Sequence, residues 1–255
     1  ATNDYIDAGS GDDVIDAGAG NDTIFAGAGD DVIEVGAVTG IEQVDGGAGT
    51  DRLAADFSGA GSVLMWYSPG ANQHLSYESS YDLIHDTLIN GADRLTLKID
   101  ATNFNATNTA VETTGIERYD IIGTEYPDLL LYLGGKRYVG GRAFGSGYDT
   151  FYADWSGTTE AIVWDNDPDA TVRLQGADIS GMERLLIATG SGNDVIRNNR
   201  TATNDYIDTG DGDDTIEGGS GADSMRGGDG SDHYFVDHPG DLVNETNADL
   251  ATGGN

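Results

Sequence analysis

Residues 8–34 read AGSGDDVID, AGAGNDTIF and AGAGDDVIE, three blocks of nine with aspartate at the sixth place and isoleucine at the eighth. Glycine fills the second and fourth places of each block. Glycines at this density would cost a helix about 1 kcal/mol each relative to alanine. Glycine does permit the positive φ angles of tight turns, and the last three residues of each block suit a strand. Each block therefore predicts a turn followed by a short strand.

The block recurs in two arrays. In the first array, Asp4, Asp13, Asp22 and Asp31 each precede an isoleucine by two residues. The second array, which includes TGDGDDTIE GGSGADSMR GGDGSDHYF (209–235), carries Asp205, Asp214, Asp223 and Asp232, followed two residues later by Ile207, Ile216, Met225 and Tyr234. ATNDYID opens both arrays at 1–7 and 202–208. Two blocks would make one flattened coil, with the eighth-place residues stacked inward as the core. Successive sixth-place aspartates would then alternate between the two edges of the coil.

A longer duplication lies between the arrays. GTDRLAADFSG (49–59) resembles GYDTFYADWSG (147–157), and GIERYDIIGTEYPDLL (115–130) resembles GMERLLIATGSGNDVI (181–196). The two segments lie further apart in the first copy than in the second, because the first copy contains an insertion. We expect a first array over 1–45, a degenerate β module over 46–143 with an insertion at about 60–114, a second copy over 144–200, a second array over 201–237, and a C-terminal segment over 238–255 that leads out of the given sequence.

The charge balance favours cations as partners. Asp and Glu number 45 against 12 Lys and Arg, which gives a formal net charge of −33. Nucleic acids and anionic membranes are bound mainly through clustered Lys and Arg, so neither is expected as a partner. The chain has no cysteine, which excludes disulfides and thiolate metal sites. No apolar run reaches the length of a membrane span.

The fixed stride of the aspartates predicts calcium. Neighbouring strands lie about 4.8 Å apart, so aspartates on one edge would repel one another unless a cation lay between them. Calcium takes six to eight oxygen ligands, and a glycine turn offers backbone carbonyls beside the carboxylate. The candidate ligands are the sixth-place residues Asp4, Asp13, Asp22, Asp31, Asp205, Asp214, Asp223 and Asp232, the fifth-place residues Asn3, Asp12, Asn21, Asp30, Asn204 and Asp213, and the turn residues Gly9, Gly11, Gly18, Gly20, Gly210, Gly212, Gly219 and Gly221.

Over about 1–35 and 202–235 the sequence resembles the RTX (repeat-in-toxin, haemolysin-type) family, whose nonapeptide binds calcium in a parallel β-helix. The resemblance implies an all-β fold, a right-handed parallel β-roll or β-solenoid whose two calcium-binding arrays flank degenerate, partly irregular β coils. It also implies a secreted or cell-surface protein of a Gram-negative bacterium, exported by type I secretion and folding on calcium outside the cell. By position, the family's calcium aspartate falls on Asp13, Asp22, Asp31, Asp214, Asp223 and Asp232.

Departures from the pattern weaken the prediction at some positions. Thr2 and Thr203 replace the fourth-place glycine at the start of each array, and alanine leads the blocks of the first array. The middle keeps isolated aspartates without their partners, and these are expected to be weak ligands at most. They are Asp51, Asp128, Asp149 and Asp194.

The remaining motifs do not indicate catalysis. WDNDPDA (164–170) spaces three aspartates as an EF-hand loop does, but Ala170 and Gly176 stand where that loop needs Gly and Glu, so an acidic surface loop is the better interpretation. The chain has no HExxH or GxSxG motif, so we expect no enzyme activity in it.

Three functions fit the sequence. The first is a calcium-binding structural module of an adhesin, S-layer or biofilm protein, with at least four ions. The second is the calcium-binding accessory region of a secreted enzyme. The third is a glycan- or peptide-binding module that uses aromatic residues of the insertion, such as Trp66, Tyr67, Tyr77 and Tyr81, although aromatic side chains more often fill a core. The oligomeric state is left open.

Overall fold

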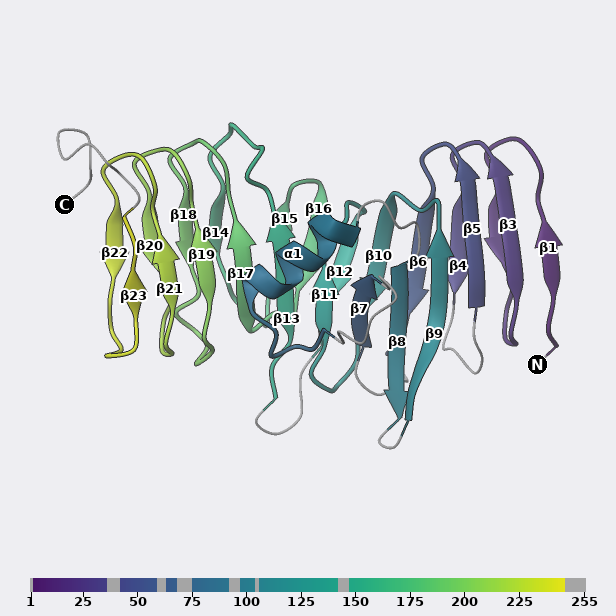
Figure 1. The fold of residues 1–255 in the computed structure, drawn as a ribbon, viewed down its shortest axis with the longest axis horizontal. Helices are drawn as coiled ribbons and strands as arrows, with labels where there is room; N and C mark the ends of the chain where they lie inside the picture. Colours follow the sequence, from purple (N-terminus) through teal and green to yellow (C-terminus); the bar gives the residue numbers. More distant parts are fainter. Residues whose placement is uncertain are drawn as a thin grey trace.

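The computed structural model describes residues 2–35, 42–58, 63–67, 75–91, 97–103, 106–141 and 147–245. The regular structure of these residues is strand apart from one helix, and most strand pairs are parallel. The all-β prediction is therefore confirmed. The strands lie side by side along an elongated body, with β1 at one end and β22 and β23 at the other (Figure 1).

The strands belong to three sheets. In spatial order, the largest sheet contains β1 (Tyr5–Asp7), β3 (Thr23–Ala28), β5 (Glu42–Ala48), β9 (Ala106–Thr114), β8 (Leu97–Asn103), β7 (Val63–Tyr67), β11 (Leu129–Leu131), β13 (Thr150–Asp154), β17 (Arg184–Ala188), β19 (Tyr206–Asp208), β21 (Ser224–Arg226) and β23 (Leu242–Val243). The second contains β15 (Val172–Leu174), β16 (Ala177–Ser180), β12 (Arg137–Val139), β10 (Arg118–Ile122), β6 (Arg52–Asp56), β4 (Val32–Val35) and β2 (Val14–Asp16). The third contains β14 (Val163–Asp165), β18 (Val195–Arg197), β20 (Thr215–Glu217) and β22 (His233–Phe235).

In both arrays, consecutive strands alternate between two sheets. Strand β1 pairs with β3 and β2 with β4, so Ile6 lies beside Ile24 and Ile15 beside Ile33. The second array repeats this arrangement with β19 and β21 in one sheet and β20 and β22 in the other. Each residue thus pairs with the equivalent residue two blocks away. The inward stacking of eighth-place residues is confirmed for the buried residues Ile15, Ile24, Ile33, Ile207, Ile216 and Met225.

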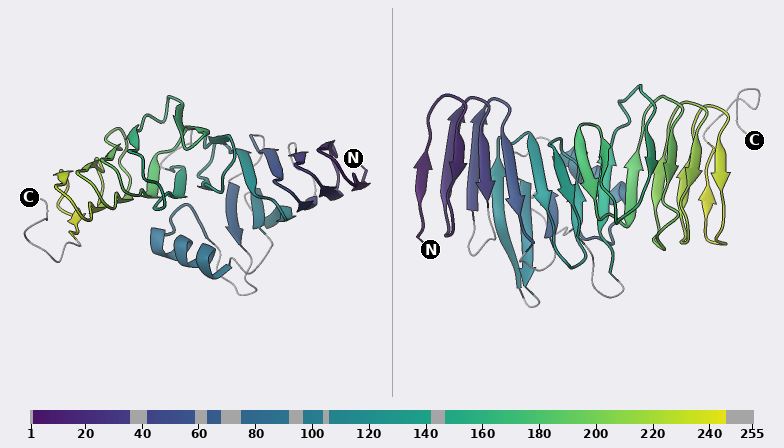
Figure 2. Two further views of the ribbon diagram at one scale, coloured as in Figure 1. Left: turned by 90° about the horizontal axis from the view of Figure 1, so that it is seen from above. Right: turned by 180° about the vertical axis from the view of Figure 1, so that it is seen from behind.

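The insertion interrupts this regular pattern. Strands β7, β8 and β9 form an antiparallel meander, whose outer strands pair in parallel with β11 and β5. Helix α1 (Tyr81–Gly91) lies across one face of the largest sheet, as the view from above makes clear (Figure 2). Tyr81 and Ile84 face inward and are buried. The insertion thus replaces coils of the largest sheet and covers that face.

The helix was not predicted, although its signals are present in the sequence. Ser80 caps the helix, because its Oγ accepts a hydrogen bond from the Leu83 amide at 3.3 Å. Tyr81, Ile84 and Leu88 have the spacing of one helical face, and all three pack against the core. The helix is much shorter than a membrane span, and the described residues contain no helix long and apolar enough to cross one.

Aromatic side chains fill the middle of the molecule. Phe151 lies 5.8 Å from Trp164 and 6.1 Å from Trp155 between ring centroids, and all three side chains are buried. In the insertion Tyr81 is buried, as expected of an aromatic side chain that fills a core, and Trp155 and Trp164 are buried outside the insertion. The side chains of Trp66 and Tyr67 lie outside the described residues, so their proposed role in ligand binding stays a prediction.

The duplicated segments occupy opposite sides of the molecule. In the first copy, GTDRLAADFSG contributes β6 and GIERYDII contributes β10, and these strands pair in the second sheet. In the second copy, the equivalent strands β13 and β17 pair in the largest sheet. The same local pairing therefore fits either side of the coil. The predicted division of the chain into arrays and modules remains a prediction.

Candidate calcium-binding turns

Most turn glycines of the arrays have backbone conformations that favour glycine. Gly9 and Gly27 occupy the same place in two stacked turns, with φ angles of 96° and 113°. A Cβ on Gly27 would overlap the carbonyl oxygen of Gly9. Gly212 and Gly230 repeat this relationship in the second array. Stacked turns therefore point carbonyl oxygens at one another's glycines, and any side chain there would push the coils apart.

The predicted turn residues are not all alike. Gly9, Gly11, Gly18, Gly210, Gly212 and Gly219 have positive φ angles. Gly20 and Gly221 do not, but a Cβ on either would overlap the carbonyl oxygen of the threonine two blocks earlier, Thr2 or Thr203. Those two positions thus need glycine for space alone.

Sixth-place carboxylates form a ladder along each edge of the coils. The amide of Asp4 donates to Asp22 Oδ1, and the amide of Asp13 donates to Asp31 Oδ1, both at 2.8 Å. In the second array the amides of Asp205 and Asp214 donate to Asp223 and Asp232 at 2.8 and 3.0 Å. One oxygen of each accepting carboxylate is thus used to hold the coils in register.

Fifth-place side chains form a second ladder in the opposite direction. Asp12 Oδ1 accepts from the Asp30 amide at 2.9 Å, and Asn204 Oδ1 accepts from the Ala222 amide at 2.8 Å. Asn3 and Asp213 accept in the same way from the amides of Asn21 and Ser231. These side chains are exposed. Their hydrogen bonds join neighbouring turns without a metal, which the sequence had not indicated.

The second oxygen of many sixth-place aspartates has no partner. Asp22 and Asp31 are each 1 % exposed, yet their Oδ2 atoms have no hydrogen bond. The same holds for Oδ2 of Asp13, Asp223 and Asp232. A buried carboxylate oxygen without a partner is costly. A calcium ion between this oxygen and the turn carbonyls would satisfy both, so the residues fit the ion. Among the described residues no three His, Cys, Asp or Glu side chains form a metal-binding group by themselves, so an ion bound here would also need backbone carbonyl oxygens.

Burial raises the pKa values of several ladder carboxyls. Desolvation is the largest cause for Asp214 and Asp223, whose pKa values each rise to about 6. The pKa of Glu42 rises to about 7, first because of burial and then because of the neighbouring Asp22 carboxylate. The ionised forms of these three carboxyls are therefore unfavourable unless a positive charge balances them.

Two predicted ligands have different surroundings. Asp4, at the first rung, is exposed. Asp205 is buried, but the Asn198 side-chain Nδ2 donates to its Oδ2 at 2.7 Å and the Thr203 hydroxyl to its Oδ1 at 3.0 Å. Thr203 is the residue that departs from the glycine pattern. Both oxygens of Asp205 therefore accept hydrogen bonds from uncharged donors.

Comparison with known families agrees with this geometry. Residues 1–33 and 201–234 match the model of the RTX calcium-binding nonapeptide repeat (four copies). The chain carries RTX repeats. RTX nonapeptide repeats bind calcium, so the two arrays are calcium-binding segments. The matched RTX segments contain the sixth-place aspartates of both arrays. No curated protein sequence matches the chain significantly.

The carboxylate ladder continues outside the RTX matches. Asp31 and Asp51 are joined by an amide-to-Oδ1 hydrogen bond, as are Asp128 and Asp149, each at 2.9 Å. Asp194 donates to Asp214 Oδ1 at 2.7 Å. The middle aspartates Asp51, Asp128, Asp149 and Asp194 are at most 1 % exposed. The sequence placed them apart from the arrays, whereas the structure places them on the same edges.

Three glutamates complete this ladder and were missed. Glu42, Glu117 and Glu183 each accept a hydrogen bond through Oε2, from the amides of Asp22, Asp51 and Asp149 at 3.2, 2.8 and 2.7 Å. The available signal was the recurrence of Gly-Ile-Glu or Gly-Met-Glu at 40–42, 115–117 and 181–183. Glutamate therefore does in these coils what aspartate does in the RTX blocks.

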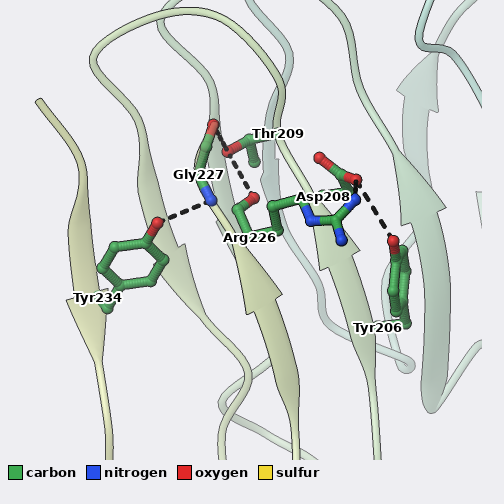
Figure 3. Close-up of polar contacts among 6 residues, drawn as sticks. All are labelled: Tyr206, Asp208, Thr209, Arg226, Gly227 and Tyr234. Carbon is green, nitrogen blue, oxygen red and sulfur yellow. Dashed lines mark hydrogen bonds and ion pairs between the residues drawn. The ribbon is translucent and has the colours of Figure 1, made fainter. Parts of the chain in front are cut away.

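Side chains on the strands add further ties between coils of the second array. Arg226 on β21 pairs with Asp208 on β19 at 3.2 Å, and the Tyr206 hydroxyl donates to the same carboxylate at 3.3 Å (Figure 3). Tyr234 takes the eighth place of the last block, and its hydroxyl accepts from the Gly227 amide at 2.7 Å (Figure 3). The last RTX coil is thus closed by a tyrosine rather than by an isoleucine.

Proposed function

We propose that this chain is a structural, calcium-stabilised module without catalytic activity, part of a secreted or cell-surface bacterial protein of the adhesin, S-layer or biofilm type. In this proposal the stacked coils form a right-handed β-roll, which is exported unfolded through a type I channel and folds on calcium outside the cell. RTX repeats are typically found in secreted proteins, which supports the location.

One observation carries the proposal: the arrays bury carboxylate oxygens that have no partner within the protein. Asp22 and Asp31 on the first array and Asp223 and Asp232 on the second each have a buried Oδ2 without a hydrogen bond. In each case the other oxygen already accepts an amide of the preceding coil. Calcium would therefore bind to oxygens that the fold has already placed and left unpaired.

The expected energy is large enough to control folding. Extracellular calcium modules bind with dissociation constants of about 10⁻⁴ to 10⁻³ M. When free calcium is ten to a hundred times that constant, each site contributes about 1.4 to 2.7 kcal/mol. Four sites would contribute about 6 to 11 kcal/mol, which is comparable to the whole stability of a typical domain. A low calcium concentration inside the cell would keep the arrays unfolded for export.

Circular dichroism can test this directly. The chain is purified in chelator and then titrated with calcium, and with magnesium as the matched control ion. We expect the β-sheet signal to rise cooperatively with calcium and to stay low at the same concentrations of magnesium, which prefers fewer ligands and a stricter geometry. A spectrum that is the same in chelator and in millimolar calcium would refute the proposal.

The type of parent protein can be tested at the level of the gene. Further copies of the unit formed by two arrays and the modules between them would favour a surface protein. An adjoining domain with an HExxH or GxSxG motif would instead favour the accessory region of a secreted enzyme. Binding to a glycan array that is lost on Trp66→Ala would favour the third function, a ligand site in the insertion.

A further inference from the structure

Two turns outside the RTX matches share one arrangement. In the first, Asp51 donates its amide to Glu117 Oε2, and its carbonyl accepts from the Arg118 amide at 3.0 Å. In the second, Asp149 donates its amide to Glu183 Oε2, and its carbonyl accepts from the Arg184 amide at 2.9 Å. The two turns lie on different sheets, beside β6 and β13. The molecule therefore builds the same turn twice.

Each turn contains a buried carboxylate oxygen without a partner. Asp51 and Asp149 are 0 % exposed, and the Oδ2 atom of each has no hydrogen bond. Among the described residues neither is ion-paired with a lysine or an arginine. Arg184, whose backbone amide contacts the Asp149 carbonyl, donates its guanidinium hydrogen bonds to the carbonyls of Tyr77, Ser79 and Asn204. Within the described residues, each carboxylate accepts a backbone amide through Oδ1, from Asp31 or Asp128, and pairs with no cationic side chain.

In both turns, the space left by a glycine's missing Cβ borders the unpartnered oxygen and a backbone carbonyl. A Cβ added to Gly46 would lie 2.7 Å from Asp51 Oδ2 and would overlap the carbonyl oxygen of Gly115. A Cβ added to Gly140 would lie 2.7 Å from Asp149 Oδ2 and would overlap the carbonyl oxygen of Gly181. Gly218 and Gly227 of the second RTX array lie against the Oδ2 atoms of Asp223 and Asp232 in the same way. The two middle turns therefore repeat the surroundings of the array turns.

In the other middle aspartates protein donors occupy the second oxygen, although Asp128 Oδ2 also lies against a glycine, Gly123. The Thr124 amide donates to Asp128 Oδ2 at 2.6 Å, and the Thr124 hydroxyl to Asp128 Oδ1 at 3.0 Å. The Thr189 hydroxyl donates to Asp194 Oδ2. The ladder therefore contains carboxylates satisfied by neutral donors and carboxylates left with one free oxygen. Asp51 and Asp149 belong to the second class.

We propose that the turns at Asp51 and Asp149 each bind a calcium ion, with the carboxylate Oδ2 and the carbonyl oxygen of Gly115 or Gly181 among its ligands. The inference extends the proposed function to a region that the RTX model does not match. Oxygen-only donors from a carboxylate and from backbone carbonyls are the ligand set of calcium. The Gly-Ile-Glu segment at 115–117 and the Gly-Met-Glu segment at 181–183 would line the opposite side of the first and second site.

Native mass spectrometry of calcium-saturated protein can count the ions. The test variant combines Asp51→Asn and Asp149→Asn, which keep an oxygen for the ladder hydrogen bond but remove the charge. The matched control combines Asp128→Asn and Asp194→Asn, which remove the same charge from satisfied carboxylates. We expect the test variant to bind two fewer ions than the wild type and the control to bind the same number.

Other outcomes separate this inference from the proposed function. If the test variant and the wild type bind equal numbers of ions while Asp22→Asn and Asp223→Asn lose ions, the inference is overturned and the calcium-binding arrays stand. If the wild type itself binds no calcium, the proposed function fails as well.

A second measurement avoids variants that fail to fold. Crystals of the wild-type chain grown with terbium, which replaces calcium at oxygen sites, would give anomalous scattering peaks at bound ions. Peaks beside Gly46 and Gly140 would support the inference. Peaks confined to the RTX arrays would overturn it whatever the variants do.

Discussion

The RTX arrays and the middle of the molecule share one ladder of carboxylates but stabilise their coils differently. In the arrays most blocks contribute one aliphatic residue to the core, such as Ile24 or Ile216, and several buried carboxylate oxygens have no partner. In the middle the core contains Phe151, Trp155 and Trp164, and threonine donors satisfy Asp128 and Asp194. The amide-to-carboxylate ladder is therefore the same whether the second carboxylate oxygen is unpartnered or bonded to a threonine.

The difference follows from the amount of apolar surface that each coil buries. An aromatic side chain buries 150–250 Å² and dominates a core energetically, whereas one isoleucine per block buries far less. The aromatic coils can therefore stay folded on apolar burial alone. The glycine-rich array coils also lose more backbone entropy on folding, because glycine has the most conformational freedom to lose. They need another source of stability, and bound calcium is the source that their geometry allows.

Removal of calcium should have the largest effect, and it should destabilise the arrays more than the middle of the molecule. In chelator we expect the amides of β2, β4, β20 and β21 to lose protection from hydrogen exchange, because about 6 to 11 kcal/mol of binding energy is withdrawn from the arrays. The amides of β10, β12 and β13 should keep much of their protection. Exchange read by mass spectrometry, with and without calcium, gives the pattern. Equal loss of protection in all strands would contradict the comparison.

The aromatic core should show the second largest effect. Trp164→Ala removes a side chain that is 1 % exposed and in contact with Phe151 and Trp155. Such a truncation costs about 3–5 kcal/mol of unfolding free energy. We expect this cost in urea unfolding both with calcium and in chelator. The matched variant Ile216→Ala, in the second array, should lower stability measurably only while calcium holds the array folded.

The pH dependence of the calcium-free protein should follow from Asp149. Burial, and then the carboxylates Asp128 and Glu183, raise the pKa of Asp149 to about 9. The folded state therefore binds a proton that the unfolded chain releases near pH 4, so stability in chelator falls as pH rises from about 4 to about 9. Between pH 6 and pH 8 the loss should be about 2 to 3 kcal/mol, since each pH unit is worth about 1.4 kcal/mol per proton.

Calcium should reverse this trend. Protons compete with calcium for the same carboxylates, so the calcium-bound protein should gain stability as the carboxyls ionise. Thermal unfolding followed at several pH values, with calcium and with chelator, gives both slopes. A chelated protein that becomes more stable between pH 6 and pH 8 would contradict the raised pKa.

The arrays could be predicted from sequence because each block specifies its own structure. The turn glycines, the sixth-place aspartate and the eighth-place isoleucine recur at one stride, so the register of Ile15 on Ile33 follows from the count. The unpartnered oxygens were also implied, since stacked aspartates need a counter-charge. What the block could not reveal is the second ladder, in which Asp12 accepts the amide of Asp30, because either a metal or an amide satisfies such an oxygen.

The middle resisted prediction because its block length varies and its residues change type. Gly46 lies five residues before Asp51, whereas Gly140 lies nine before Asp149, so no fixed stride connects them. Glu117 and Glu183 replace aspartate in the ladder and hide the repeat. Helix α1 lies in an insertion with no repeat to compare it with, although Ser80 and the spacing of Tyr81 and Ile84 were sufficient signals. The structure of these regions depends on pairing between segments distant in the sequence. A single stretch of sequence does not reveal that pairing.

The smallest expected effect comes from the neutral donors that replace a cation in the middle. Thr189 and Asp194 are both buried, and the Thr189 hydroxyl donates to Asp194 Oδ2. Thr189→Val keeps the shape but leaves a buried carboxylate oxygen unpaired, at a cost of about 1–3 kcal/mol. Urea unfolding in chelator measures the loss. Thr215→Val, a half-buried position on β20, is the control and should change stability by less than about 0.5 kcal/mol.

The same variant also tests whether an unpaired oxygen is enough to attract calcium. Removing the Thr189 hydroxyl gives Asp194 the unpartnered Oδ2 that Asp51 and Asp149 already have. If that oxygen is what distinguishes a calcium turn from a neutral one, calcium should restore part of the lost stability of Thr189→Val and should not do so for the control. An equal loss with and without calcium would show that the turn carbonyls around Asp194 are placed differently from those at the array turns, and that the hydroxyl alone does not decide between the two kinds of coil.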